Sequence, residues 1–266
     1  MYSAPLSSVS NQRNAILALL LALAAAAWTL ILWHGENADP AMAVAMSSPT
    51  MGLRVPVFVA IWLVMMVAMM FPSAAPMILT FHRIQSGKRR RGENFVATWL
   101  FVAGYLVIWT AAGAVAYAGA LAAEVIAARA ALSAAAAARV GGALLIAAGL
   151  YQLTPLKNVC LAKCRSPIGF IMTSWRDGAA GALRMGMVHG FYCLGCCWLL
   201  FVILFPLGIM NIAAMAVLTL VIFAEKSLAW RRATVYAISA VLVGYGVLVM
   251  AAPQALPTFA APHARP

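Results

Sequence analysis

One short segment places a histidine and three cysteines where the sequence otherwise predicts a membrane-spanning helix. It reads Met185-Gly-Met-Val-His189-Gly-Phe-Tyr-Cys193-Leu-Gly-Cys196-Cys197. At about 100° per residue, the side chains of Met185, His189, Cys193 and Cys196 share one helix face, and Cys197 lies at its edge. Such polar groups are costly in hydrocarbon unless something binds them. Thiolate, thioether and imidazole ligands select soft or borderline metal ions, so the segment predicts a site for Cu(I) or, second, Zn(II).

A second set of sulfur atoms lies on the predicted span that contains residues 62–76. Its four methionines form two pairs spaced by one helical turn, Met65 with Met69 and Met66 with Met70. Thioethers suit Cu(I) better than zinc, although methionine is also ordinary apolar filler in helices. Pro72 and Pro76 follow, and they should bend the helix and free backbone carbonyl groups. We interpret the methionines as further candidate ligands, with packing as the alternative.

Two more cysteines and one acidic residue complete the set of candidate ligands. Cys160 and Cys164 lie one helical turn apart after the fourth predicted span, and they could bind one ion if the helix continues past Pro155. Their basic neighbours favour the thiolate form. Glu225 is an acidic residue near the end of the sixth predicted span, where it could act as a ligand, a proton carrier or the partner of a basic residue. The alternative is that Glu225 and Lys226 both reach toward the membrane interface.

The composition is that of a membrane protein. Hydrophobic residues make up 65% of the chain and charged residues only 9%, against roughly 25% charged residues in soluble domains. Stretches of about 20 apolar residues predict seven spans, at residues 15–33, 55–81, 95–123, 140–155, 186–208, 212–229 and 234–252. The predicted fold is an all-α polytopic helix bundle. A single transmembrane domain, 15–252, lies between a cytoplasmic N-terminus, 1–14, and an external disordered tail, 253–266.

The net charge of +12 could suggest a nucleic-acid-binding protein, but its distribution follows the loops of a membrane protein. Fourteen of the 18 Lys and Arg residues fall on one predicted side: Arg13, Arg83, Lys88, Arg89, Arg90, Arg91, Lys157, Lys163, Arg165, Arg176, Arg184, Lys226, Arg231 and Arg232. By the positive-inside rule this side is cytoplasmic, so the N-terminus is inside and the C-terminus outside. The expected location is a bacterial inner membrane, and the first span is a retained anchor because its apolar core exceeds that of a signal peptide.

This orientation places all five cysteines toward a reducing compartment, so structural disulfides are not expected. A single buried cysteine often acts only as a small hydrophobe, but three cysteines beside His189 favour metal or thiol chemistry. The pattern Gly186-x-x-x-Gly190 lets a neighbouring helix approach closely and supply further ligands. The methionine-bearing second span is the neighbour that we expect there.

Four segments together resemble one known family. They are Trp62 to Pro76, Leu153 to Pro167, His189-Gly-x-x-Cys193-x-Gly-Cys196-Cys197-Trp198 and Ala224-Glu225-Lys226. They are similar to the bacterial predicted metal-binding integral membrane proteins, a domain of unknown function, over residues 58–250. The resemblance implies metal binding and leaves the ion and the reaction open.

These observations predict that the second, fourth, fifth and sixth spans converge on a soft-metal site near the cytoplasmic leaflet. The expected role is to bind Cu(I) and to hand it over or translocate it, as a binding protein rather than an enzyme. The expected partners are the lipid bilayer and other membrane subunits or a metal-donor or acceptor protein. Two alternatives stay open: a membrane thiol-disulfide oxidoreductase, in which Cys196 or Cys197 is attacked and Cys160 or Cys164 resolves, and a structural subunit of a larger complex.

Overall fold

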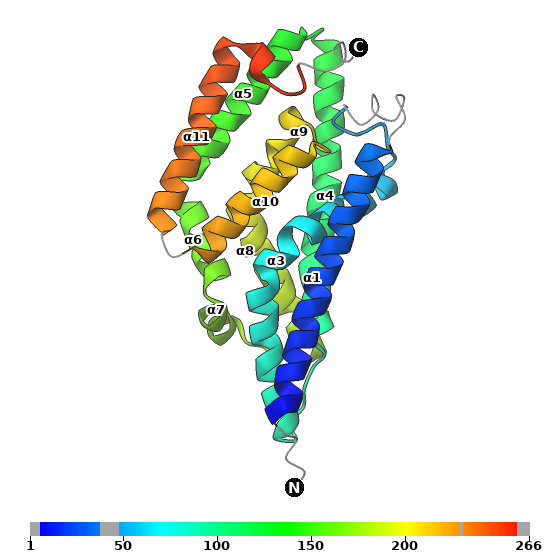
Figure 1. The fold of residues 1–266 in the computed structure, drawn as a ribbon, viewed down its shortest axis with the longest axis vertical. Coiled ribbons are helices and arrows are strands. Elements are labelled where there is room, and N and C mark those ends of the chain that lie inside the picture. The colour runs from blue at the N-terminus through cyan, green and yellow to red at the C-terminus, as the bar shows by residue number, and fades with distance from the viewer. Residues whose placement is uncertain (1–5, 38–47, 229–230, 260–266) are drawn as a thin grey trace.

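A computed structural model describes residues 6–37, 48–228 and 231–259, and these residues form helices without any β-strand (Figure 1). The predicted all-α class is therefore confirmed. The elements are α1 (Leu6–Glu36), α3 (Val55–Arg90), α4 (Thr98–Arg129), α5 (Ala134–Tyr151), α6 (Pro155–Arg165), α7 (Pro167–Ser174), α8 (Gly178–Val202), α9 (Leu204–Leu207), α10 (Ile212–Ser227), α11 (Arg231–Ala251) and the 3₁₀ turn η1 (Pro253–Ala255).

Among the described residues, six helical segments are long and apolar enough to cross a membrane, which indicates an integral membrane protein. They correspond to α1, α3, α4, α5, the continuous α8 and α9, and α11. The remaining predicted span, 212–229, is α10, which has 16 residues against the about 20 needed to span a bilayer. A turn precedes it: Gly208 has a φ of +96° and Asn211 caps the helix by accepting from the Ala214 amide. The chain still descends through α10 and rises again through α11 (Figure 1).

Two predicted boundaries need correction. The fourth span ends at Tyr151 instead of 155, because Pro155 starts the separate helix α6 and Thr154 caps it. The tail was predicted to be disordered from residue 253, but residues 253–259 fold back onto the bundle. Leu256 is buried, and the Thr258 hydroxyl donates to the Pro206 carbonyl at 2.7 Å. Residues 260–266 lie outside the described part of the chain.

Helices α4 and α8 pack with their backbones in contact. A Cβ atom added to Gly104 would lie 2.1 Å from the Leu183 carbonyl oxygen, and one added to Gly186 would lie 2.0 Å from the Phe101 carbonyl oxygen. The close approach predicted from Gly186 and Gly190 is therefore present. The neighbour is α4, however, and not the methionine-bearing α3. Gly104 of α4 is the matching small residue at this crossing.

The prolines of α3 free a carbonyl group, as predicted. Pro72 has no amide hydrogen, so the carbonyl oxygen of Ala68, four residues earlier, loses its helical donor. The Trp28 indole of α1 donates to this oxygen at 3.2 Å. The helix continues from Val55 to Arg90 across both prolines. The neighbouring helix α1 therefore satisfies the freed carbonyl.

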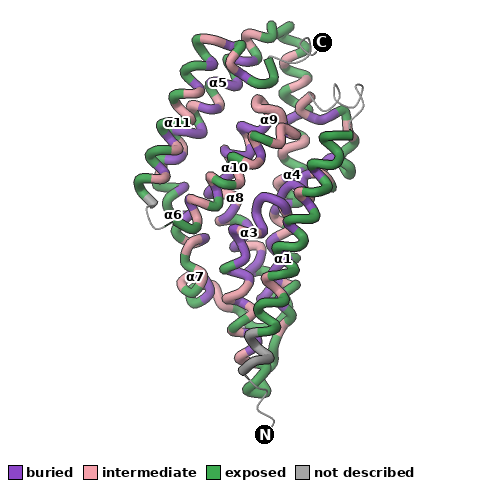
Figure 2. Tube along the Cα trace, viewed as in Figure 1, coloured by how far each residue is buried: buried purple, intermediate pink, exposed green. Residues whose placement is uncertain are grey.

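The buried surface runs along the facing sides of α3, α4 and α8, while the outer faces of α1 and α11 are exposed (Figure 2). Many exposed side chains are large and apolar, including Val115, Phe191 and Val241. In water such a surface would be a liability, whereas contact with lipid explains it. The helices are thus compatible with a bilayer as their surrounding medium.

The contact between α4 and α8 gives a direct test. Gly104→Ala or Gly186→Ala should force the two backbones apart and destabilise the fold by at least about 1–3 kcal/mol, the usual cost of overpacking. Thermal unfolding of the detergent-purified protein measures the change. Gly119→Ala is the matched control on α4, since nothing lies within 4 Å of its added Cβ, and it should stabilise the helix by up to about 1 kcal/mol. Equal melting temperatures for all three variants would contradict the packing described.

Candidate metal centre

The cysteines of α6 and α8 meet inside the helix bundle. All five are free thiols and all are buried. The thiol of Cys164 on α6 interacts with those of Cys193 and Cys196 on α8, and Cys197 interacts with the same two. We refer to Cys164, Cys193, Cys196 and Cys197 as the thiol cluster. The structure thus brings together cysteines that lie some thirty residues apart in sequence.

Cys160 lies at the seam between α6 and α8, beside the thiol cluster. Its sulfur would be 2.8 Å from a Cβ atom added to Gly195, so glycine at this position makes room for the thiol. The Tyr151 hydroxyl donates to the Gly195 carbonyl and ties the end of α5 to the same place. Cys160 and Cys164 lie one turn apart on α6, as predicted, although that helix starts at Pro155 and does not continue α5.

Three other helices surround Cys193. The Tyr105 hydroxyl of α4 lies 3.2 Å from the Cys193 sulfur. The Lys226 ammonium of α10 donates to the same sulfur at 3.1 Å and to the Ser73 hydroxyl of α3 at 3.2 Å. Polar side chains of α4, α8 and α10 therefore meet at Cys193, and Ser73 of α3 joins them through Lys226.

His189 lies one turn before Cys193 and has no polar partner. Its ring stacks on those of Phe101 and Tyr105, with centroids 5.8 and 5.5 Å away, and meets the Phe170 ring edge-on at 5.5 Å. The ring is buried, and neither ring nitrogen has a hydrogen bond. Buried polar atoms without partners are uncommon in proteins and call for an explanation. An imidazole with both nitrogens free is chemically able to bind a metal ion.

Glu225 is occupied elsewhere. Its carboxylate accepts from the Lys157 ammonium of α6 at 2.7 Å, and both side chains are almost completely buried. Arg165 adds a hydrogen bond to the Glu225 backbone carbonyl at 2.5 Å. The structure therefore places Glu225 in an ion pair between α6 and α10 and not in the thiol cluster. Lys226 points differently from Glu225, as the spacing of about 100° predicts.

The four predicted methionine ligands of α3 lie in the buried core. Met65, Met69 and Ser73 are spaced by four residues and so share one face of α3. Because Ser73 contacts Lys226, this face is directed toward α10 and Cys193. The other predicted sulfur ligands, Met66, Met70 and Met185, are equally buried.

Within the residues that the structure describes, no three His, Cys, Asp or Glu side chains are arranged to hold a metal ion together. The local hydrogen bonds explain this. The thiols of Cys196 and Cys197 both donate to the backbone carbonyl of Cys193, at 3.1 and 2.8 Å. Lys226 contacts the Cys193 sulfur itself. Binding of an ion would therefore require rotation of thiol groups that already lie close together.

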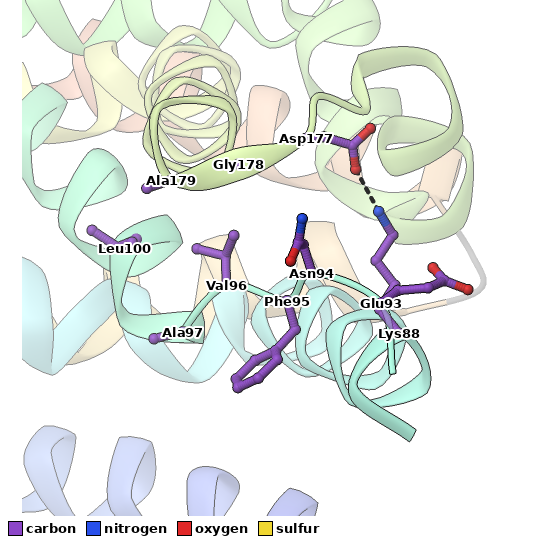
Figure 3. A pocket seen from close by; sticks show the side chains of 10 residues that line it. All are labelled: Lys88, Glu93, Asn94, Phe95, Val96, Ala97, Leu100, Asp177, Gly178 and Ala179. Carbon is purple, nitrogen blue, oxygen red and sulfur yellow. Dashed lines mark hydrogen bonds and ion pairs between the residues drawn. The ribbon is translucent and has the colours of Figure 1, made fainter. Parts of the chain in front are cut away.

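A solvent-facing pocket of about 700 Å³ lies at the start of α4 and α8 (Figure 3). It contains none of the predicted ligands. Lys88 and Asp177 form an ion pair at its edge, which lowers the pKa of the Asp177 carboxyl together with a hydrogen bond from the Trp175 indole. This pocket joins the end of α3 to the start of α8, and it has no ligands for a soft metal ion.

Sequence reasoning missed Tyr105, Ser73 and Lys157 as neighbours of the site. Each is a polar side chain on a helix that must pack in an apolar medium, and that property is visible in the sequence. Their partners, however, are 68 or more residues distant in sequence, so spacing along one helix does not reveal the contacts.

A protein-family model described as PpoB2, copper chaperone, matches residues 59–249. The matched region contains the thiol cluster, His189, the methionines of α3 and Lys226. No curated protein and no solved structure shows a significant match to the chain. Since the family model covers well over half of the sequence, the chain belongs to the PpoB2 copper chaperone family.

Proposed function

We propose that this protein binds Cu(I) at the thiol cluster, within the membrane, and hands it over to a partner or across the bilayer. The observation that carries the proposal is the meeting of Cys164 from α6 with Cys193 and Cys196 from α8, one turn from an imidazole without a partner. Membership of a copper chaperone family supports the choice of cargo.

Cys164 and Cys193 are the first ligands in this proposal, because they approach each other from different helices. Cys196 and Cys197 are next, since rotation of their thiols away from the Cys193 carbonyl frees them for the ion. Cys160 lies at the edge of the cluster. His189 can ligate through either ring nitrogen. Glu225 is held by Lys157, so it positions α6 against α10 and reaches an ion only if that pair opens.

Cu(I) is preferred to Zn(II) for chemical reasons. Thiolates and thioethers are soft ligands that stabilise Cu(I), and the face of α3 that carries Met65 and Met69 approaches the site. Zinc sites are usually tetrahedral, with four fixed N, S or O ligands. Zn(II) remains the second choice, through thiolate and imidazole ligands.

We further propose that the site lies near the cytoplasmic leaflet of a bacterial inner membrane, in a single transmembrane domain. The basic ends of α3 and α10 and the short helix α6 belong to the side with most Lys and Arg residues. Figure 1 supports opposite locations for the two termini, because α1 begins and α11 ends at opposite ends of the molecule. Copper would then be received at the cytoplasmic side by the cysteines of α6.

A thiol-disulfide oxidoreductase is the second candidate function. The interaction of Cys164 with Cys196 favours it, because these two cysteines could form and break a disulfide. Against it, no cysteine is more than 8% exposed, whereas thiol exchange requires in-line access to the attacked sulfur. Counting thiols before and after mild oxidation distinguishes the two functions.

The thiol cluster can be tested by removing the two ligands from different helices. The Cys164→Ser, Cys193→Ser double variant should lose stoichiometric copper, because serine cannot replace a soft thiolate ligand. The measurement is metal per protein by elemental analysis, after loading with Cu(I) under reducing conditions and desalting. Ala148→Ser, which buries a hydroxyl on α5, is the control and should bind as much copper as wild type. If wild type carries no more copper than the double variant, the proposed function is wrong.

The methionines of α3 need a separate test, because they could be ligands or packing. Met65→Leu with Met69→Leu nearly conserves volume and should cost less than about 1.5 kcal/mol in stability. If the thioethers bind the ion, Cu(I) affinity, measured by competition with a chromophoric chelator, should fall by about tenfold or more, the equivalent of one lost ligand interaction. Met215→Leu changes a buried methionine on α10 and should leave affinity unchanged. If the Met65, Met69 variant binds Cu(I) as tightly as wild type does, these two methionines serve only in packing.

The orientation follows from the positive-inside rule and can be measured with reporter fusions. A reporter inserted after Arg90 or after Trp175 should report a cytoplasmic location, and one at the C-terminus an external location. These positions lie outside the apolar segments, so the insertions should not disrupt a span. A cytoplasmic C-terminal reporter would show an even number of crossings and would exclude the proposed orientation.

A further inference from the structure

Lys226 is the charged side chain that touches the thiol cluster. Its ammonium lies 3.1 Å from the Cys193 sulfur and 3.2 Å from the Ser73 hydroxyl. The other nearby basic groups are engaged: Lys157 pairs with Glu225, and Arg165 donates to the carbonyls of Glu225 and Leu228. Among the described residues, no carboxylate lies within ion-pair distance of Lys226. Its positive charge is therefore directed at sulfur.

We propose that Lys226 sets the metal selectivity of the thiol cluster, favouring a monovalent over a divalent ion. This inference rests on the proposed function, with Cys164 and Cys193 as the two thiolate ligands. Thiols deprotonate when they bind a metal. Two thiolates with Cu(I) carry one net negative charge, and the Lys226 ammonium makes the site neutral. Two thiolates with Zn(II) are already neutral, so the same ammonium leaves one net positive charge.

This difference in net charge matters because of the groups that surround the site. A net charge inside an apolar medium is costly because no solvent stabilises it. The groups beside Cys193 are the Tyr105 hydroxyl and the thiols of Cys196 and Cys197, which stay neutral when Cys164 and Cys193 are the two thiolate ligands. The neutral Ser73 hydroxyl lies on the other side of the Lys226 ammonium. The nearest ion pair, Lys157 with Glu225, cancels internally. Lys226 therefore decides the net charge of the loaded site.

The position of Lys226 is fixed by α3. Ser73 donates its own hydroxyl hydrogen to the Met70 carbonyl at 2.9 Å, so its lone pairs face the Lys226 ammonium. Lysine suits this role because its ammonium is a compact point charge that can donate to a hydroxyl and a sulfur together. The result is a fixed cation in contact with a ligand sulfur.

The test compares two metal affinities in one set of variants. Cu(I) and Zn(II) affinities of the full-length protein in detergent are measured separately, each by competition with a chromophoric chelator. Lys226→Met and Lys226→Gln should lower the ratio of Cu(I) to Zn(II) affinity by about tenfold or more, since one charge is removed. Gln keeps a donor for Cys193, so it separates loss of charge from loss of the hydrogen bond. Lys226→Arg keeps the charge and should keep the ratio.

Lys163→Met is the matched control, because it removes a positive charge from α6 at a half-exposed position. It should leave the ratio unchanged. If the ratio is unchanged in both Lys226→Met and Lys226→Gln while wild type binds Cu(I), the selectivity role is overturned and the proposed function stands. If wild type binds no Cu(I), the proposed function itself fails. Monodisperse elution and wild-type melting temperatures establish that each variant is folded. If Lys226→Met is not folded, the affinity ratio of Lys226→Gln decides the test.

Discussion

The requirement that polar groups find partners inside an apolar medium governs this structure. Lys157 and Glu225 are almost completely buried and form an ion pair through one carboxylate oxygen. The carbonyl of Ala68, left without a donor by Pro72, is bonded by Trp28. An unpaired polar group costs more in hydrocarbon than in water, so these pairs fix how α6 meets α10 and how α1 meets α3. Among the described residues, Trp109, Gln152 and Glu225 each have one buried side-chain atom without a hydrogen bond, and His189 has two. His189 therefore stands out as a site for a ligand.

Backbone contact and sulfur chemistry depend on each other in this fold. Glycines on α4 and α8 allow the two helices to touch along their backbones, and this contact brings the Tyr105 ring onto His189 and its hydroxyl onto Cys193. On the opposite side, Gly195 makes space for the Cys160 sulfur. Thus α8 has small residues on two faces, and its thiols lie between the closely packed helices α4 and α6. Larger residues at these glycines would increase the distances between the groups that form the site.

The sequence predicted the helical class, the buried face of α8 and the free cysteines, because each follows from periodicity or composition along one segment. It did not predict that α4 is the helix packed on Gly186, since a small residue permits the close approach of any helix with a complementary surface. It also did not reveal Ser73, Tyr105 or Lys226 as neighbours of Cys193. Those contacts depend on the rotation of four helices about their axes, which no single helix determines. The predicted span 212–229 runs past Ser227, where α10 ends, because the apolar residue Leu228 leaves the helix with an extended backbone.

The hydrogen bond from Trp28 to Ala68 crosses the boundary of the family match, which begins at residue 59. The donor belongs to α1, outside the matched region, and the acceptor belongs to α3, one turn before the proline and between the methionines. The matched region therefore does not itself provide the hydrogen-bond donor for the Ala68 carbonyl. A relative with the same prolines but another first helix needs a different donor at this carbonyl, or a different bend in α3. The first helix is in this sense part of the architecture of the matched region, although it lies outside that region.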